Sequence, residues 1–176
     1  MQTPRFAATS LVCLVLTSAA TAGEVFPDRA ELELLFTREV EINSGLTEGP
    51  AVAPDGSIYF TDMPFGLDDN THIMRYDPAT GETTLFTDDA GKSNGLAFDA
   101  DGYLIACDGA DGGTRSLVRW DIETGQRVTL ADNIEGRRFN SLNDLCIDSQ
   151  GRIYFTDPRY IGDESRDLEH MAVYRF

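Results

Sequence analysis

Residues 48–62 read EGPAVAPDGSIYFTD, and the same pattern returns as NGLAFDADGYLIACD at 94–108 and as NDLCIDSQGRIYFTD at 143–157. The three segments align without gaps. Two columns of the alignment hold one residue type throughout: Gly56, Gly102 and Gly151 in one, and Asp62, Asp108 and Asp157 in the other. Each segment combines two short apolar or alternating runs around a glycine-containing turn, which predicts a strand, a tight hairpin turn and a second strand.

The repeat extends beyond these segments. Ile73–Asp77 aligns with Leu117–Asp121, and each is followed by a turn that ends in glycine and by a fourth apolar run, 83–87 or 127–130. A unit of four antiparallel strands in roughly 40–50 residues is typical of a β-propeller blade. A β-sandwich would also contain short strands and regular turns, but it would lack this column-by-column repetition. The sequence therefore predicts an all-β protein, a β-propeller of four-stranded blades.

The repeat boundaries predict the organisation of the chain. Residues 44–88 and 89–131 each form a blade, and residues 132–176 form part of a third, so about two and a half blades are expected. Residues 23–43 form a leader in which Leu32–Thr37 resembles a fourth strand and would close the last blade of a complete ring. Because so few blades leave unpaired strand edges, we expect the 176 residues to be a partial chain that aggregates or melts without cooperativity.

The first 22 residues resemble a signal peptide. They contain Arg5, an apolar run over 7–16 and small residues that end in Ala20-Thr21-Ala22, a typical cleavage pattern. The apolar run is too short to span a bilayer, which argues against a membrane anchor. A buried N-terminal helix is the other alternative. The prediction is an exported protein, periplasmic or secreted, whose mature chain begins near Gly23.

The composition limits the partners. The 176 residues include 30 acidic and 14 basic side chains, for a net charge of −16. Such a surface repels nucleic-acid phosphates and anionic lipid headgroups, so neither a nucleic acid nor a membrane is an expected partner. With 41% hydrophobic residues the chain can still build a packed core, which excludes general disorder.

Two cysteines remain once the signal segment is removed. Cys107 and Cys146 both lie in apolar, strand-like runs. Export would permit a disulfide between them. Buried free thiols are the preferred interpretation, because cysteines in separate strands seldom face each other at bonding distance.

A third column of the alignment holds polar residues at the start of each first strand: Glu48, Asn94 and Asn143. First strands line the central channel of a propeller, so these side chains are expected to converge at one end of it. One carboxylate and two amides are hard oxygen donors that suit Ca²⁺ or Mg²⁺, and suit Zn²⁺ less, because zinc usually takes His or Cys ligands. The alternative is that these residues only cap the starts of strands.

The motifs in their order resemble one enzyme family. LTEGP at 46–50, IYFTD at 58–62, SNGLAF at 93–98, RFNSLND at 138–144 and GRIYFTDP at 151–158 are similar to the senescence marker protein/gluconolactonase/luciferin-regenerating-enzyme family. This resemblance implies a six-bladed propeller that hydrolyses small sugar lactones with one divalent cation, calcium first, with magnesium and zinc as alternatives.

The resemblance also implies roles for individual residues. Glu48 and Asn143 match metal ligands of the family, whereas Asn94, Arg138 and Asn140 match positions that contact substrate. The family's later asparagine ligand and its general base would lie beyond Phe176. Two other hypotheses stay open: a non-catalytic propeller that binds a ligand or partner, and a nonfunctional gene fragment. Among enzymes, the related phosphotriesterase and strictosidine-synthase-like propellers stay open too.

Overall fold

The computed structural model describes residues 30–37, 45–64, 70–159 and 163–176. Contacts divide the chain into Met1–Glu33 and Leu34–Phe176. The second unit holds every strand described here. Among the described residues there is no helix of the length and apolar character needed to cross a membrane. The expected signal peptide lies outside the described residues. Residues 30–37 adopt no strand, although the ring of Phe36 packs 5.1 Å from that of Phe60.

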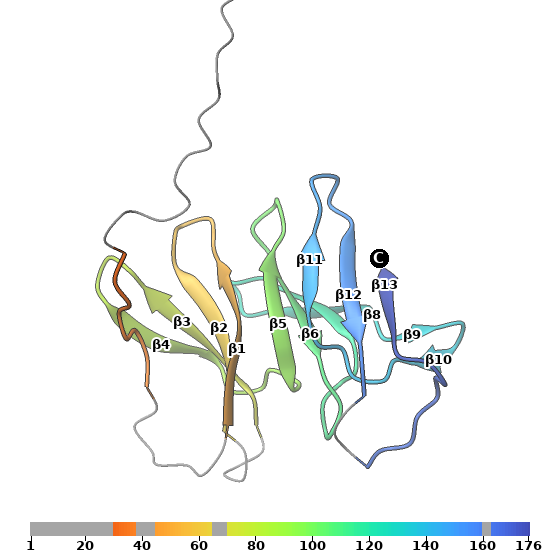
Figure 1. Cartoon of the computed structure of the whole chain (residues 1–176). Helices are drawn as coiled ribbons and strands as arrows, with labels where there is room; N and C mark the ends of the chain where they lie inside the picture. The colour runs from red at the N-terminus through yellow and green to blue at the C-terminus, as the bar shows by residue number, and fades with distance from the viewer. Residues whose placement is uncertain (1–29, 38–44, 65–69, 160–162) are drawn as a thin grey trace, which may run out of the picture. The chain divides into compact units, whose positions relative to one another are not determined.

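Antiparallel sheets make up the second unit (Figure 1). The first sheet follows chain order and contains β1 (Gly45–Val52), β2 (Ile58–Pro64), β3 (His72–Asp77) and β4 (Glu82–Thr87). The second sheet repeats this order with β5 (Ser93–Phe98), β6 (Leu104–Asp108), β7 (Leu117–Trp120) and β8 (Arg127–Ala131). The third contains β11 (Leu145–Ile147), β12 (Ile153–Asp157) and β13 (Ala172–Arg175), and the short strands β9 (Asn133–Ile134) and β10 (Arg137–Arg138) pair separately.

The three sequence repeats form the three predicted hairpins, β1–β2, β5–β6 and β11–β12. At their turns Gly56 and Gly102 both have φ of 87°, and Gly151 has 78°. These left-handed conformations explain the glycine column, because other residues adopt them at a cost. The predicted third and fourth strands are also confirmed as β3, β4, β7 and β8. An all-β fold of antiparallel sheets is therefore established, whereas a closed six-bladed ring stays a prediction.

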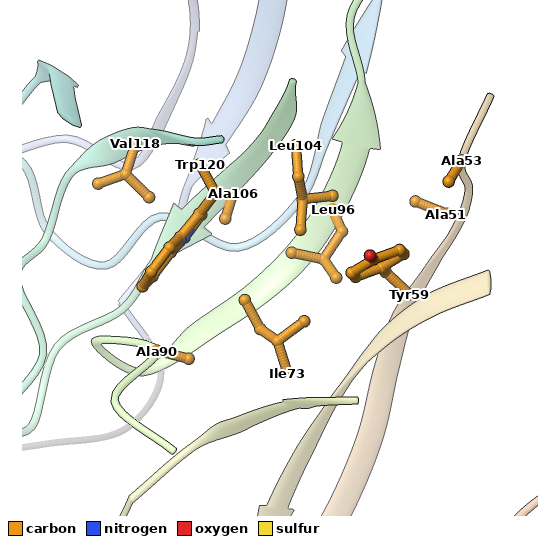
Figure 2. Close-up of a cluster of buried hydrophobic side chains, with 10 residues drawn as sticks. All are labelled: Ala51, Ala53, Tyr59, Ile73, Ala90, Leu96, Leu104, Ala106, Val118 and Trp120. Carbon is orange, nitrogen blue, oxygen red and sulfur yellow. The ribbon is translucent and has the colours of Figure 1, made fainter. Parts of the chain in front are cut away.

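The core lies between neighbouring sheets. One cluster, shown in Figure 2, joins Tyr59 of β2 and Ile73 of β3 to Leu96, Leu104 and Trp120 of the second sheet. Phe86 links its aromatic rings, with ring centroids 5.4 Å from Tyr59 and 5.7 Å from Trp120. Burial of large apolar side chains from both sheets holds the two sheets together.

A second cluster joins the second and third sheets. It contains Ile105 and Cys107 of β6 together with Phe139, Leu142 and Phe155. Strand β6 supplies both clusters, since Leu104 and Ala106 point to one side and Ile105 and Cys107 to the other. All five residues of β6 are buried. This accounts for its unbroken apolar run, which is typical of a strand covered on both faces.

The cysteines are free thiols, as predicted. Cys107 is fully buried, and burial raises the pKa of its thiol well above the ordinary value. Cys146 differs from the expectation of a buried thiol, because its side chain is exposed on β11. It stands where strand alternation turns the side chain away from the second core cluster, to which Leu145 and Ile147 contribute.

Candidate functional site

One pocket of about 450 Å³ lies where the first strands of the three hairpins come together. β5 contacts both β1 and β11, and the three strands stand next to one another in Figure 1. Eight residues line the pocket: Glu48, Gly49, Pro50, Asn94, Leu96, Asn143, Asp144 and Leu145. The structure thus brings together the three polar residues of the predicted column, which lie far apart in the sequence.

Register irregularities occur at the pocket residues. The pairing of β1 with β2 shifts between Glu48 and Ala51, and the pairing of β5 with β6 shifts between Ser93 and Leu96. Such bulges re-aim a side chain and increase local twist. The equivalent positions of two repeats, which carry Glu48 and Asn94, therefore depart from regular strand geometry where they face the pocket.

Two glycines let the neighbouring strands approach. A Cβ atom at Gly95 would lie 2.7 Å from the Cα atom of Asp144 and 2.6 Å from its Oδ1 atom. A Cβ atom at Gly49 would lie 2.9 Å from the backbone nitrogen of Leu96. Contacts this short do not occur for real side chains, so both positions require glycine.

Hydrogen bonds cross from strand to strand around the pocket. The Thr61 hydroxyl, fully buried, lies 3.1 Å from the carbonyl oxygen of Glu48 and 3.0 Å from that of Asn94. The Gly95 N–H donates to the carbonyl of Asn143 at 2.7 Å. The backbones that carry Glu48, Asn94 and Asn143 are therefore tied to one another through Thr61 and Gly95.

Asp144 is a pocket residue to which the sequence analysis gave no role. Its backbone N–H donates to the Thr156 hydroxyl at 3.0 Å, and its Oδ1 accepts the N–H of Leu145 at 2.8 Å. The alignment contained a signal for it, because the column that holds Gly49 and Gly95 holds an aspartate in the third repeat. The pocket therefore contains two carboxylates, Glu48 and Asp144, rather than one.

The donor set fits a hard cation. Two carboxylates and two amide side chains supply oxygen ligands of the kind that Ca²⁺ and Mg²⁺ prefer. No group of three His, Cys, Asp or Glu side chains suited to a metal occurs within residues 30–37, 45–64, 70–159 and 163–176. Any cation in the pocket would thus depend on the amide oxygens of Asn94 and Asn143 as well as on the carboxylates.

Arg138 and Asn140 do not line the pocket. Arg138 is exposed on β10, and its backbone N–H donates to the Asp167 carboxylate at 3.2 Å. Asn140 is 1% exposed, and its side-chain amide donates to the His170 carbonyl at 2.8 Å and to Asp157 at 3.2 Å. Of the five site residues expected from the sequence, the structure groups Glu48, Asn94 and Asn143 and places the other two elsewhere.

The repeated aspartates Asp62, Asp108 and Asp157 are all buried. Asp108 accepts hydrogen bonds from the Ser93 and Thr114 hydroxyls, both at 2.6 Å, and forms an ion pair with Arg127. Burial raises the pKa of Asp157, against the opposing effects of the Asn140 and Ser141 N–H groups and the charge of Arg115. Both carboxylates therefore depend on specific donors to stay buried.

Two comparisons of the sequence with known proteins give the same family. A sequence model described as the SMP-30/Gluconolactonase/LRE-like region matches residues 7–111. A gluconolactonase of Zymomonas mobilis is 34% identical over an alignment of 183 residues that covers 90% of this chain and 49% of that protein. This chain thus spans about half the length of that relative.

Solved structures give the same result. A gluconolactonase of Xanthomonas campestris superimposes with a TM-score of 0.64 at 29% identity, over 75% of this chain and 44% of that one. A second structure, of a protein assigned to the gluconolactonases, has a TM-score of 0.67 at 27% identity, over 85% of this chain and 50% of that one.

Proposed function

Because the chain belongs to the SMP-30/gluconolactonase/LRE-like family, we propose that it contributes to a lactone hydrolase that opens small sugar lactones with the help of one divalent cation. The observation that carries this proposal is the pocket that contains Glu48, Asn94, Asn143 and Asp144. Its sheets would be blades of a six-bladed propeller, with β1, β5 and β11 as channel-lining strands.

The donor set supports the choice of cation. Glu48 and Asp144 supply negative charge, and the amide oxygens of Asn94 and Asn143 supply neutral ligands, all of them hard. Calcium is the first choice for such a set, followed by magnesium. Zinc is the weakest candidate, because it favours imidazole and thiolate ligands, and no histidine or cysteine is among the lining residues.

The chemistry follows from the pocket. A bound cation would polarise the lactone carbonyl and stabilise the developing oxyanion. The Glu48 carboxylate on β1 would hold the cation. Asn143, whose backbone carbonyl accepts the Gly95 N–H, would be a further ligand of the cation or would orient the substrate. Asp144 lies beside Asn143 and would add a second negative charge to the site. Asn94 faces the same pocket from β5 and would contact the substrate.

The experiment is a variant series in the full-length protein. Glu48→Gln should lose divalent-ion binding and aldonolactone hydrolysis together, because ligand charge strongly determines affinity for hard cations. Asn143→Ala should reduce hydrolysis sharply, Asp144→Asn should weaken ion binding, and Asn94→Ala should be milder. Calcium, magnesium and zinc are titrated into each variant while lactone opening is followed.

The control is Asp101→Ala, an exposed change at the β5–β6 turn, outside the pocket. It should leave ion affinity and hydrolysis unchanged. Full activity in Glu48→Gln, or hydrolysis that survives complete chelation, would contradict the proposal.

A further inference from the structure

The three residues that lead toward the pocket residues Asn143 and Asp144 are held unusually tightly. We call Phe139, Asn140 and Ser141 the anchored turn. Phe139 is 3% exposed and Asn140 is 1% exposed, although the turn belongs to no strand. Buried backbone outside regular structure needs partners for its polar groups, and here side chains supply them.

Asp157 supplies the acceptors. It ends β12 and is fully buried. Its Oδ2 atom accepts the Asn140 N–H at 2.9 Å, and its Oδ1 atom accepts the Ser141 N–H at 2.7 Å. A single carboxylate thus binds two consecutive peptide groups, which fixes both the position and the orientation of the backbone between them.

Two buried arginines supply the donors. The Arg115 Nε–H donates to the Phe139 carbonyl at 2.6 Å, and an Arg159 Nη1–H donates to the Asn140 carbonyl at 3.2 Å. Arg115 is 2% exposed and has a φ of 52°, a conformation that is unfavourable for a residue with a side chain. Burial and the charges of Arg138 and Arg159 lower its pKa. Such strain and desolvation persist only where the surrounding structure enforces them.

The anchored turn connects directly to the pocket. After the buried Leu142, the Asn143 N–H donates to the Thr156 carbonyl at 3.0 Å, one residue before Asp157. The end of β12 therefore holds both the anchored turn and the pocket residue that follows it. The second repeat has a parallel contact: Asp108, the counterpart of Asp157, accepts the hydroxyl of Ser93, the residue before Asn94.

We propose that Asp157 is a positioning residue, which places Asn143 and Asp144 in the pocket by holding the anchored turn, with Arg115 of the β6–β7 connection as a second residue that holds the turn. The effect of Asp157 on cation binding rests on the proposed function, whereas its effect on the position of Asn143 and Asp144 does not. Asp157 touches neither substrate nor cation in this scheme and acts through the backbone of Asn140 and Ser141 and through the Asn140 side chain.

The test uses Asp157→Asn in the full-length protein. Asparagine has the same shape, but one of its two terminal atoms is a donor that would face an N–H group, so one backbone bond is lost. The first readout is hydrogen exchange of the Gly95 amide, which bonds the Asn143 carbonyl and reports its position without a metal. The second is the apparent Ca²⁺ affinity, measured by titration.

We expect Ca²⁺ affinity to fall about tenfold, the lower end of the range for residues that orient metal ligands. Gly95 exchange should accelerate up to about tenfold, because loss of one hydrogen bond changes a local opening equilibrium by roughly this factor. The matched control is Leu104→Ala, on β6 and fully buried in the cluster between the first and second sheets, which contains no residue of the anchored turn. It should lower the melting temperature at least as much and leave both readouts within about twofold. Equal changes in the two variants, or an unchanged Gly95 exchange rate in Asp157→Asn, would overturn the proposal.

Two further arms keep the test decisive. If Asp157→Asn does not fold, Arg115→Lys takes its place, because lysine keeps the charge but loses the Nε donor to Phe139. It should accelerate Gly95 exchange about threefold, on the same reasoning, and no change there would count against the proposal. If the unmodified protein binds none of Ca²⁺, Mg²⁺ and Zn²⁺, the proposed function fails while Gly95 exchange still decides the positioning role.

Discussion

Gly49 on β1 and Asn94 on β5 approach so closely that a Cβ atom at position 49 would overlap the Asn94 carbonyl oxygen. The two residues belong to different repeats, and both line the pocket. The distance between the first two hairpins is therefore set by the absence of a side chain at position 49.

The first prediction tests this contact by comparing two glycines. Gly49 and Gly56 both have positive φ, of 55° and 87°, but a Cβ atom at Gly56 would meet nothing within 4 Å. Gly56→Ala should cost only the conformational penalty, about 1–2 kcal/mol. Gly49→Ala should cost about 1–3 kcal/mol more, because the new methyl group overpacks the strand contact.

Denaturant unfolding of the full-length protein measures both changes. If both variants lose the same free energy of unfolding, β1 and β5 can move apart at no cost, and their close approach at Gly49 does not contribute to stability. Ion titration of Gly49→Ala should also show weaker binding, since the change moves Glu48 relative to Asn94.

The second prediction concerns the Thr61 hydroxyl between the carbonyls of Glu48 and Asn94. Thr61→Val keeps the shape of the side chain but removes its hydrogen-bond donor. It should cost about 0.5–1.5 kcal/mol, the usual net value of one hydrogen bond, because the two part-buried carbonyl oxygens lose this donor.

Thr83→Val is the matched control. The Thr83 hydroxyl on β4 is buried without a hydrogen-bond partner among the described residues, so its removal should be neutral or stabilising. Thermal unfolding of the two variants measures both changes. Thr61→Val should have the lower melting temperature, and the reverse order would contradict the prediction.

The third prediction concerns pH. The Glu164 carboxylate accepts the Gly112 N–H at 3.0 Å and lies 3.8 Å from Arg115. The Gly112 N–H and the charges of Arg115 and Arg159 lower its pKa below the ordinary 4.5. A carboxyl whose pKa is lowered by folding stabilises the folded state above its unfolded value, and this stabilisation is lost as the pH falls through the lowered pKa.

Glu164→Gln should remove this dependence. The gap in unfolding free energy between the unmodified protein and the variant should be largest near neutral pH and shrink as the pH falls through the lowered pKa of Glu164. Glu82→Gln, an exposed change on β4, is the control and should show little gap at any pH. A gap for Glu164→Gln that stays constant across the range would show that its charge is irrelevant to stability.

The fourth prediction concerns export, for which residues 1–22 provide the motive. Mass spectrometry of the protein from its native cells should find an N-terminus at or near Gly23 in the periplasmic or secreted fraction. An intact Met1 in the cytoplasmic fraction would contradict the assignment of a signal peptide.

The sequence by itself determined the hairpins and the polar column. Strand periodicity and turn glycines act over a few residues, so the repeats could be read without any distant contact. Because equivalent positions of a repeat occupy equivalent places, aligning Glu48, Asn94 and Asn143 also predicted that they would meet in one pocket.

Other features were decided by the tertiary structure alone. The burial of Asn140 against Asp157, the reach of Arg115 to Phe139 and the strand contacts at Gly49 and Gly95 all join residues that no local pattern relates. The segment 32–37 has the pattern of a strand yet adopts none in the structure, so a strand-like pattern by itself does not fix pairing with another strand. Short-range preferences select the elements, but the partners of buried polar groups are settled only when distant parts of the chain exclude water between them.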